Sequence, residues 1–459
     1  MIPEEALIKL KNILKPDCLL TGINNLEDYS SDSTKLKYMP DAAAFPSSNE
    51  EISEIFRLAN EYKFPVIPRG GGSGKTGGAL PVKGGLVLAM DRFNRILEID
   101  QDNLIAKIEP FVITEHLQKE VEKIGLFYPP DPASNDVSTL GGNVAENAGG
   151  LRGLKYGVTG DYVLGLTVVL PTGDIIKTGV ETAKGVAGYD LTSLIVGSEG
   201  TLAVVTSITL KLLPKPEAKK TMIACFRDIT AAAKTVSDII RSKIMPATLE
   251  FIDRLSIDCV RSQIEIKIPE DTGAILLIEV DGDKKLVEGD AEKVKKICKG
   301  NRVVDFKLAS DEREVELIWD ARRKISPSLL ELKPGKISED IVVPRSRIPD
   351  LITFLRDLSK KYNLPIPAYG HAGDGNIHVN VLLDRENPDE VNKGDNIIKE
   401  LFQKVIDLGG TITGEHGIGI TKAPYMEMEF SKPAIELMMR LKAAFDPNNI
   451  LNPGKIFME

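Results

Sequence analysis

The stretch PRGGGSGKTGG, residues 68–78, is the most informative segment of the chain. Consecutive glycines allow backbone N–H groups to converge on an anion without clashes from Cβ atoms. The loop is not a Walker A motif, because Arg69 stands where a glycine is required five residues before Gly74. Residues 72–77 match the pattern GxGxxG, but the glycines and proline of residues 78–85 follow where a dinucleotide site of the Rossmann type needs a helix. The segment therefore predicts a phosphate-binding loop of neither common type.

A second group of glycine-rich segments follows further along the chain. Its parts are PPDP at 129–132, STLGGN at 138–143, NAGG at 147–150 and GSEGTL at 197–202. Two glycine-lined regions that each permit close backbone approach suit a long, flat cofactor that carries phosphate.

Composition limits the classes of protein that fit. The 459 residues exceed the roughly 250–300 at which a single core stops growing, so at least two domains are expected. The net charge of -9 argues against nucleic acid as a partner. No apolar run reaches the roughly 20 residues of a membrane helix, and residues 1–20 are typical of an amphipathic helix rather than a signal peptide. The 4 cysteines lie far apart without a CxxC pattern, as expected for buried thiols in a reducing cytoplasm.

The order of predicted elements indicates an α+β chain. Residues 1–60 predict helix, loop and helix, and residues 66–215 predict short strands separated by glycine-dense loops. Residues 217–410 alternate helices with strands, which is typical of helices packed on one face of an antiparallel sheet. Strands are expected at 86–90, 105–108, 166–170, 202–213, 275–280, 342–343 and 377–383. The later helices are expected near 228–243, 285–299, 346–362 and 394–407.

Three of the 4 histidines lie in two glycine-rich motifs, YGHAGDGNIHVN at 369–380 and TGEHGIG at 413–419. Two neutral imidazoles and one carboxylate form a common open site for Zn²⁺, Fe²⁺ or Mn²⁺. The motifs therefore indicate a metal site, with a structural polar cluster as the alternative. His116 lies in an ordinary helical context, and no role is expected for it.

Together these motifs resemble the FAD-linked oxidases with the vanillyl-alcohol-oxidase type of fold. The most similar branch contains the glycolate oxidase flavoprotein subunit, D-lactate dehydrogenases and D-2-hydroxyglutarate dehydrogenases. The resemblance runs from about residue 38 to Lys455. It implies a two-part FAD-binding domain at 1–216, a substrate or cap domain with an antiparallel sheet and helices at 217–410, and a C-terminal segment at 411–459 that returns to the FAD domain.

The resemblance also implies which residues bind FAD. They are Arg69, Gly70, Gly71, Gly72, Ser73, Gly74, Lys75, Thr76 and Gly77 at the pyrophosphate, Pro130, Ser138, Gly141, Gly142, Asn143 and Gly149 along the flavin, Gly200 and Val204 towards the adenine, and Asn452 at the flavin. Some relatives attach FAD covalently through a histidine in the first loop. This loop contains no histidine, so non-covalent FAD is expected.

In the same branch, the residues matching His371, His378 and Glu415 bind the metal, and His416 matches the catalytic base. The imidazole of His416 would accept the proton of the substrate hydroxyl while hydride passes to the flavin. The metal would hold the hydroxyl and carboxylate of the substrate and lower the pKa of the hydroxyl.

A carboxylate substrate also needs a cation. Arg322, in the segment WDARRKIS at 319–326, matches the carboxylate anchor of the family, and its planar fork suits a bidentate grip. Ser326 lies one helical turn further on and shares the face of Arg322. Lys336 stands near the position of a lysine in relatives, although its spacing to Pro344 differs by two residues from that of the hydroxyglutarate enzymes. Ser326 and Lys336 are therefore additional substrate candidates.

The expected reaction is oxidation of a small D-2-hydroxy acid to the 2-oxo acid. D-lactate is favoured over D-2-hydroxyglutarate because no second basic cluster for a distal carboxylate is evident, and glycolate remains an alternative. A flavoprotein subunit that mainly relays electrons within a complex is a second class. A metal hydrolase is a third class, but it would leave the glycine-rich segments unexplained.

The sequence does not identify the acceptor that takes the electrons from the flavin. The chain contains no recognisable haem or iron–sulfur ligation, so a partner or small acceptor is required. In the resembling branch this acceptor is an electron-transfer flavoprotein, an iron–sulfur subunit, a cytochrome or a quinone. The expected location is the cytoplasm, or the membrane surface through a partner.

Overall fold

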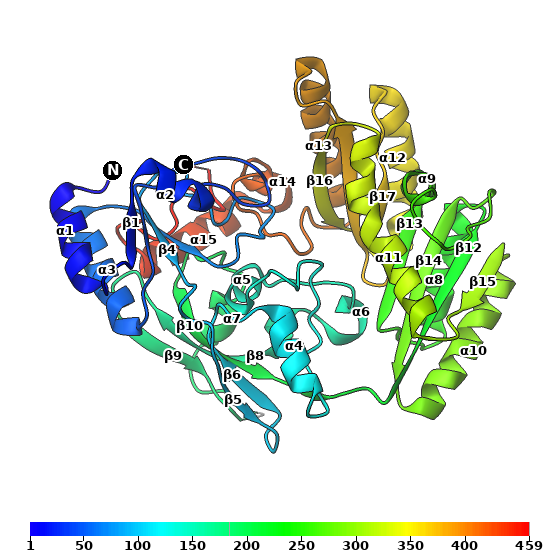
Figure 1. Ribbon diagram of the computed structural model, residues 1–459. Helices are drawn as coiled ribbons and strands as arrows, with labels where there is room; N and C mark the ends of the chain where they lie inside the picture. The colour runs from blue at the N-terminus through cyan, green and yellow to red at the C-terminus, as the bar shows by residue number, and fades with distance from the viewer. Residues whose placement is uncertain (183, 459) are drawn as a thin grey trace. The chain divides into compact units, whose positions relative to one another are not determined.

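The computed structural model describes residues 1–182 and 184–458. The chain forms two compact units, which contain different parts of the colour ramp in Figure 1. Unit 1 consists of Met1–Gly149, Val158–Lys215 and the C-terminal segment from Glu415. Unit 2 consists of Gly150–Gly157 and Pro216–Gly414. The sequence thus returns to unit 1 after completing unit 2.

The first sheet of unit 1 has the strand order β1-β2-β4-β3, and only the β1–β2 pair is antiparallel. Its elements are β1 (Leu19–Thr21), β2 (Ala42–Ala44), β3 (Val66–Arg69) and β4 (Leu86–Ala89), with helices α1 (Glu4–Ile13) and α3 (Asn49–Tyr62). The helices pack on the sheet through an apolar core that includes Phe56. Near the C-terminus, Leu451 forms a parallel bridge to Val66, and Asn452 N donates to Val66 O at 2.8 Å. The tail therefore lies beside the strand that leads into the glycine loop.

The second sheet of unit 1 is antiparallel, in the order β5-β6-β10-β8-β9. Its strands are β5 (Ile96–Asp100), β6 (Ile105–Ile108), β8 (Val163–Val169), β9 (Ile175–Gly179) and β10 (Val204–Lys211). The remaining α-helices and strands described in this unit are α2 (Ile23–Leu26), α4 (Thr114–Glu122), β7 (Leu126–Phe127), α5 (Leu140–Glu146), α7 (Leu191–Ile195), β11 (Leu213–Pro214), α14 (Met426–Glu429) and α15 (Lys432–Phe445). The strand that the sequence predicts at 202–213 is β10, which begins at Val204. The residues before it form a turn, in which Thr201 N donates a hydrogen bond to Ser198 O.

Unit 2 is built on a seven-stranded antiparallel sheet in the order β15-β12-β14-β13-β17-β18-β16 (Figure 1). Its strands are β12 (Ala218–Phe226), β13 (Thr248–Asp253), β14 (Ala274–Gly282), β15 (Asp305–Leu308), β16 (Gly335–Val342), β17 (Ala368–His371) and β18 (Asn376–Leu383). Its main helices are α8 (Ile229–Arg241), α9 (Arg254–Val260), α10 (Lys284–Gly300), α11 (Glu312–Ser328), α12 (Ile348–Tyr362) and α13 (Pro388–Asp407).

Helices cover both faces of this sheet, which corrects the expectation of a single covered face. Residues 274–280 of β14 are all buried, so neither face of this strand meets solvent. Ile275 and Leu277 share an apolar core with Ile257 of α9 and Ile318 of α11. The alternate side chains face the opposite side, where α8 and α10 contact β14. The uninterrupted apolar run of β14 is the sequence signal for two-sided burial.

A short segment of the N-terminal half packs with unit 2. The segment Gly150–Gly157 contains the helix α6 (Gly153–Tyr156). Lys155 Nζ and Tyr156 Oη both donate to the carboxylate of Asp281 on β14, the tyrosine at 2.7 Å. These polar contacts explain why residues 150–157 separate from the rest of the range 1–216 that the sequence assigns to one domain.

Candidate functional site

The polar residues of unit 2 gather on one face of its sheet, because side chains alternate along a strand. On β18, His378 and Asn380 alternate with the fully buried apolar residues Ile377, Val379 and Val381. The register pairs Tyr369 with His378, and Glu250 with His371, so these four side chains share a face. This face is also the one on which α9 and α11 pack.

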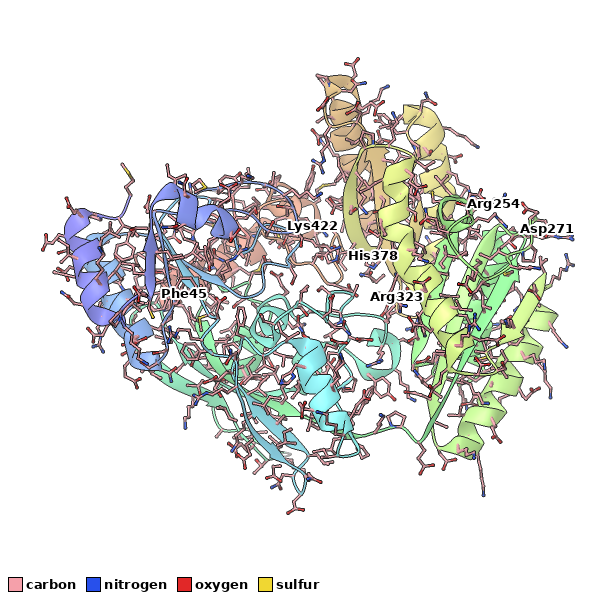
Figure 2. The ribbon with its side chains drawn as sticks, in the orientation of Figure 1. Phe45, Arg254, Asp271, Arg323, His378 and Lys422 are labelled. Atoms are coloured by element: carbon pink, nitrogen blue, oxygen red, sulfur yellow. The ribbon has the colours of Figure 1, made fainter. Side chains whose placement is uncertain are left out.

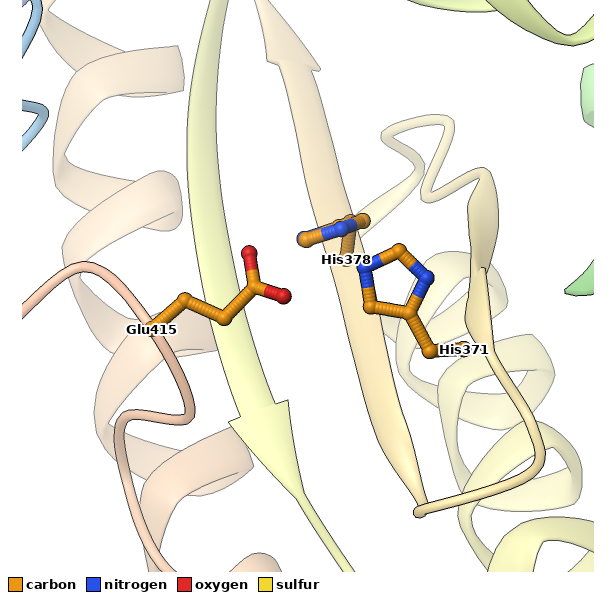
Figure 3. Close-up of side chains that lie close together, drawn as sticks. All are labelled: His371, His378 and Glu415. Atoms are coloured by element: carbon orange, nitrogen blue, oxygen red, sulfur yellow. The ribbon is translucent and has the colours of Figure 1, made fainter. Parts of the chain in front are cut away.

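Two of the predicted metal ligands come from one hairpin. His371 ends β17, His378 lies in β18, and the tight turn between the strands uses Gly375 at φ +94°. The two imidazole rings are perpendicular, with centroids 5.2 Å apart. Ligand atoms of His371, His378 and Glu415 all lie within 4.8 Å of one another, and Figure 3 shows the three side chains converging.

The placement of Glu415 follows from its neighbours in the chain. Gly414 N donates to the Asp340 carboxylate at 2.9 Å, and Asp340 lies directly opposite His378 in the β16–β18 register. The next residue, Glu415, thus begins beside the hairpin. On its other side, a Cβ added to Gly149 would lie 3.2 Å from the Glu415 side chain. Gly149, predicted to lie along the flavin, therefore packs against a predicted metal ligand.

The three side chains fit a divalent metal by their chemistry. Two imidazoles and a carboxylate are the donor set expected for Zn²⁺, Fe²⁺ or Mn²⁺ with open coordination positions. The hydrogen bond of His371 to Glu250 uses Nδ1, so a metal would bind this imidazole through Nε2. His378 and Glu415 are half-buried, so a ligand can reach the cluster.

Glu250 is a buried carboxylate that the sequence analysis missed. It is 0% exposed, accepts from Arg322 Nε at 2.7 Å, and is hydrogen-bonded to His371 Nδ1. Burial alone would raise the pKa of this carboxyl, but the charges and hydrogen bonds of His371 and Arg322 outweigh it and lower the pKa to about 2. The signal was available, since an acid inside the apolar run TLEFID (residues 248–253) needs a buried partner.

Arg322 lies on the same face as the histidines. Its guanidinium is 4.6 Å from the centroid of the Tyr369 ring, and its side chain is 13% exposed. The next residue, Arg323, which Figure 2 labels, is 56% exposed and pairs with Glu316. The fold thus separates the two adjacent arginines into a partly enclosed one and a solvated one.

The other two substrate candidates are bonded to each other. Lys336 on β16 donates from Nζ to Ser326 Oγ at 2.6 Å and to Ser326 O at 3.0 Å. Ser326 lies on α11 one turn after Arg322, and Lys336 is on the histidine-bearing face of β16, in register with Leu382. Both residues therefore lie on the side of the sheet that carries Arg322 and the histidines.

His416 belongs to a loop whose backbone is hydrogen-bonded to two other residues of unit 1, Thr76 and Glu199. Thr76 Oγ1 donates to His416 O at 2.9 Å, and Thr76 O accepts from Ile420 N at 2.8 Å. The buried Glu199 carboxylate accepts from Ile418 N at 2.8 Å and Gly419 N at 2.6 Å. Burial raises the pKa of Glu199, and these two N–H donors offset part of the effect. The bonds fix the backbone of the loop.

Replacing Glu199 by glutamine is expected to loosen this loop. An amide supplies one acceptor where the carboxylate supplies two, so one buried N–H of Ile418 or Gly419 loses its partner, at a cost of about 1–3 kcal/mol. Hydrogen exchange followed by mass spectrometry should show faster exchange in the peptide 415–422. Glu109→Gln is the control, because Glu109 is a buried carboxylate of unit 1 that bonds Arg95 instead. Equal exchange in both variants would contradict the assigned role of Glu199.

The predicted FAD residues of the two glycine-rich regions lie together in unit 1. A Cβ on Gly71 would lie 2.5 Å from Val137 O, so the first loop packs directly on the segment that leads into α5. Asn452 Nδ2 donates to Gly78 O and to Glu199 O, each at 3.0 Å. The tail therefore joins the first loop to the segment around Gly200, and all three are predicted FAD-binding segments.

The remaining predicted FAD residues have definite places in the same unit. Gly70–Gly77 form an irregular loop after β3 in which Lys75 is exposed, Ser138 precedes α5, Gly141–Asn143 lie in α5, Val204 begins β10 and Pro130 is buried with its carbonyl accepting from Gln118. Asn143 Nδ2 donates to Thr114 Oγ1 at 2.7 Å. No helix follows the first loop, which agrees with the rejection of a Rossmann site.

Two buried polar atoms of these residues fit an FAD ligand. Arg69 donates from Nη2 to Ser31 O at 2.8 Å, whereas its Nη1 is buried without a hydrogen-bond partner. Asn452 Oδ1 is also buried without a partner. Burial lowers the pKa of Arg69. A phosphate-bearing cofactor with donor groups would satisfy both atoms, since buried polar groups are normally hydrogen-bonded.

Two family descriptions match most of the chain. An FAD binding domain matches residues 40–179, and the C-terminal domain of FAD linked oxidases matches residues 215–456. Glycolate oxidase subunit GlcD of Bacillus subtilis (strain 168) is 50% identical over 446 residues, which cover 95% of each chain. D-lactate dehydrogenase of Anaerostipes hadrus is 34% identical over 466 residues, which cover 99% of this chain and 98% of that enzyme.

Solved structures show the same fold at low identity. p-Cresol methylhydroxylase with substrate bound has a TM-score of 0.81 at 20% identity, covering 99% of this chain and 96% of that one. Alkyldihydroxyacetonephosphate synthase has a TM-score of 0.76 at 21% identity, covering 99% and 86%. At these identities the likeness concerns the fold alone.

Proposed function

This chain belongs to the FAD-linked oxidases, and we propose that it is the dehydrogenase that converts a small 2-hydroxy acid, D-lactate or glycolate, to the 2-oxo acid. It is an FAD-dependent oxidoreductase of the glycolate oxidase and D-lactate dehydrogenase family. Its fold is the vanillyl-alcohol-oxidase type, as expected from the sequence. The observation that carries the proposal is the convergence of His371, His378 and Glu415 on the face of the sheet against which α11 packs with Arg322.

In this proposal each residue has one task. Arg322 binds the substrate carboxylate through its free guanidinium edge, since its Nε is already bonded to Glu250. His416 accepts the proton of the substrate hydroxyl. His371, His378 and Glu415 hold a divalent metal, which would supply Lewis-acid polarisation of that hydroxyl. FAD, held non-covalently by the loop 69–78 and its neighbours, supplies the two-electron acceptor.

Two substrates have specific support. D-lactate is the substrate that the sequence analysis favours, and the 34% identical relative is named D-lactate dehydrogenase. Glycolate is supported by the 50% identical relative, which is named a glycolate oxidase subunit. The two acids differ by one methyl group, so a hydrophobic contact worth about 1–3 kcal/mol decides between them.

The electrons are proposed to leave through an electron-accepting partner protein or a quinone. The 50% identical relative is named a subunit, which supports a partner protein. No helix in the described residues combines the length and hydropathy needed to cross a membrane. A flavoprotein subunit that mainly relays electrons within a complex is the second candidate, and the same subunit name favours it.

Anaerobic stopped-flow absorbance of the FAD-loaded protein tests the proposal. D-lactate, L-lactate, glycolate and D-2-hydroxyglutarate are each mixed with the protein, before and after treatment with a metal chelator. We expect rapid bleaching of the flavin by D-lactate or glycolate and at least a hundredfold slower bleaching after chelation, restored by added Zn²⁺ or Mn²⁺.

Each result has a separate meaning. Bleaching that survives chelation would remove the metal from the mechanism but keep the hydroxy-acid reaction. Bleaching by D-2-hydroxyglutarate alone would change the substrate. No bleaching by any of the four acids would contradict the dehydrogenase proposal and favour the electron-relay subunit.

A further inference from the structure

One carboxylate bonds both a predicted metal ligand and the predicted substrate anchor. Glu250 is bonded through Oε1 to His371 Nδ1 and through Oε2 to Arg322 Nε, the latter at 2.7 Å. It comes from β13, whereas its partners come from β17 and α11. All three belong to unit 2, and both partners are themselves largely buried.

The chemistry of the two partners assigns the role of each oxygen. An arginine guanidinium has only donors, so Oε2 must accept from it. That leaves Oε1 as an acceptor facing His371, which requires the proton on Nδ1. A neutral imidazole with its proton on Nδ1 has its lone pair on Nε2, which is the nitrogen through which a metal would bind.

We propose that Glu250, held by Arg322, is a positioning residue that fixes the tautomer and ring direction of His371 and thereby sets the metal affinity of the cluster. This inference rests on the metal site of the proposed function. It adds a residue outside the predicted ligand set, and it makes metal binding depend on a group that never touches the metal or the substrate.

The glutamine variant gives a directional test. In Glu250→Gln, the single carbonyl oxygen must stay on Arg322, because a guanidinium cannot accept a hydrogen bond. The amide NH₂ then faces His371 Nδ1 and donates to it. This arrangement moves the imidazole proton to Nε2 and removes the lone pair needed by the metal. The side-chain volume hardly changes, so the effect is on metal binding rather than packing.

Asp253 provides a matched control on the same strand. Its carboxylate accepts from Ser256 N at 2.8 Å and from Ala368 N at 3.0 Å, so its hydrogen bonds serve α9 and β17 rather than His371 or Arg322. Asp253→Asn should therefore cost stability without changing metal affinity. Glu250→Asp is a third variant, because it keeps two acceptor oxygens on a shorter stem.

The experiment measures Zn²⁺ dissociation constants of the FAD-loaded, metal-stripped full-length protein by competition with a chromogenic chelator. We expect Glu250→Gln to raise the dissociation constant about 10–100-fold, Asp253→Asn to leave it within about threefold, and Glu250→Asp to fall between wild type and Gln. FAD content and melting temperature check that each variant is folded.

The outcomes separate this inference from the proposed function. Wild-type affinity in Glu250→Gln overturns the inference and leaves the metal site intact. If the glutamine variant does not fold, wild-type affinity in Glu250→Asp overturns it instead. Equal losses in Glu250→Gln and Asp253→Asn would reduce Glu250 to a structural role. A wild-type protein that binds no Zn²⁺, Fe²⁺ or Mn²⁺ would overturn the metal site and this inference together.

Discussion

Substituting asparagine for His416 is expected to reduce the rate of flavin bleaching by the substrate by about 10²–10⁴-fold, the usual contribution of a general base. Asparagine is close in size to histidine but accepts no proton at neutral pH. The loop should keep its conformation, because Thr76 bonds the backbone carbonyl of His416 and Glu199 bonds the following N–H groups. FAD should therefore remain bound, and the loss should appear in the rate and not in the flavin content.

Stopped-flow bleaching at saturating substrate measures this rate directly. His116→Asn is the matched control, since His116 is the exposed histidine of α4 and has no proposed role. Its rate should equal that of the wild type. If His416→Asn also bleached at the normal rate, His416 would not be the base, and the proton would have to pass to another group.

Most of the fold prediction came from the local spacing of apolar residues along the sequence. The amphipathic helices expected near 228–243, 285–299 and 346–362 are α8, α10 and α12 within a few residues, because one apolar face at helical spacing determines each of them. The prediction that helices cover only one face of the unit 2 sheet was wrong. The uninterrupted apolar run of β14 indicated burial on both faces, because a strand with one exposed face would alternate apolar and polar residues.

The residues of the candidate site also fall into two groups, those that sequence motifs identify and those that only the fold brings together. The glycine loops and histidine motifs are contiguous in sequence, so their residues could be named in advance. The partner of His371 could not, because Glu250 lies 121 residues away and meets it only through the β13–β17 register. The role of Glu199 was missed for the same reason, since its partners follow 219 and 220 residues later. The partners of a buried charged residue that lie far away in the sequence can be identified only from a three-dimensional structure.

The second large effect is expected at the carboxylate anchor. Arg322→Lys should raise KM for the hydroxy acid roughly 10–100-fold while kcat changes much less, because the lost interaction contributes to binding in both the ground and transition states. Lysine keeps the positive charge beside the buried Glu250, so the variant avoids the large cost of an uncompensated buried carboxylate. It loses the planar fork, which can bond the substrate carboxylate and Glu250 at the same time.

Steady-state kinetics with an artificial electron acceptor separate KM from kcat, and Arg323→Lys is the matched control. Arg323 is the next residue of the same helix, but its side chain is exposed and pairs with Glu316, so its replacement should leave both constants unchanged. Equal KM values in the two variants would remove the anchor role from Arg322. A fall in kcat with an unchanged KM would instead make Arg322 important in the transition state. A raised KM in Arg322→Lys alone would assign the substrate carboxylate to Arg322, which contacts Glu250 and Tyr369 on the histidine-bearing face.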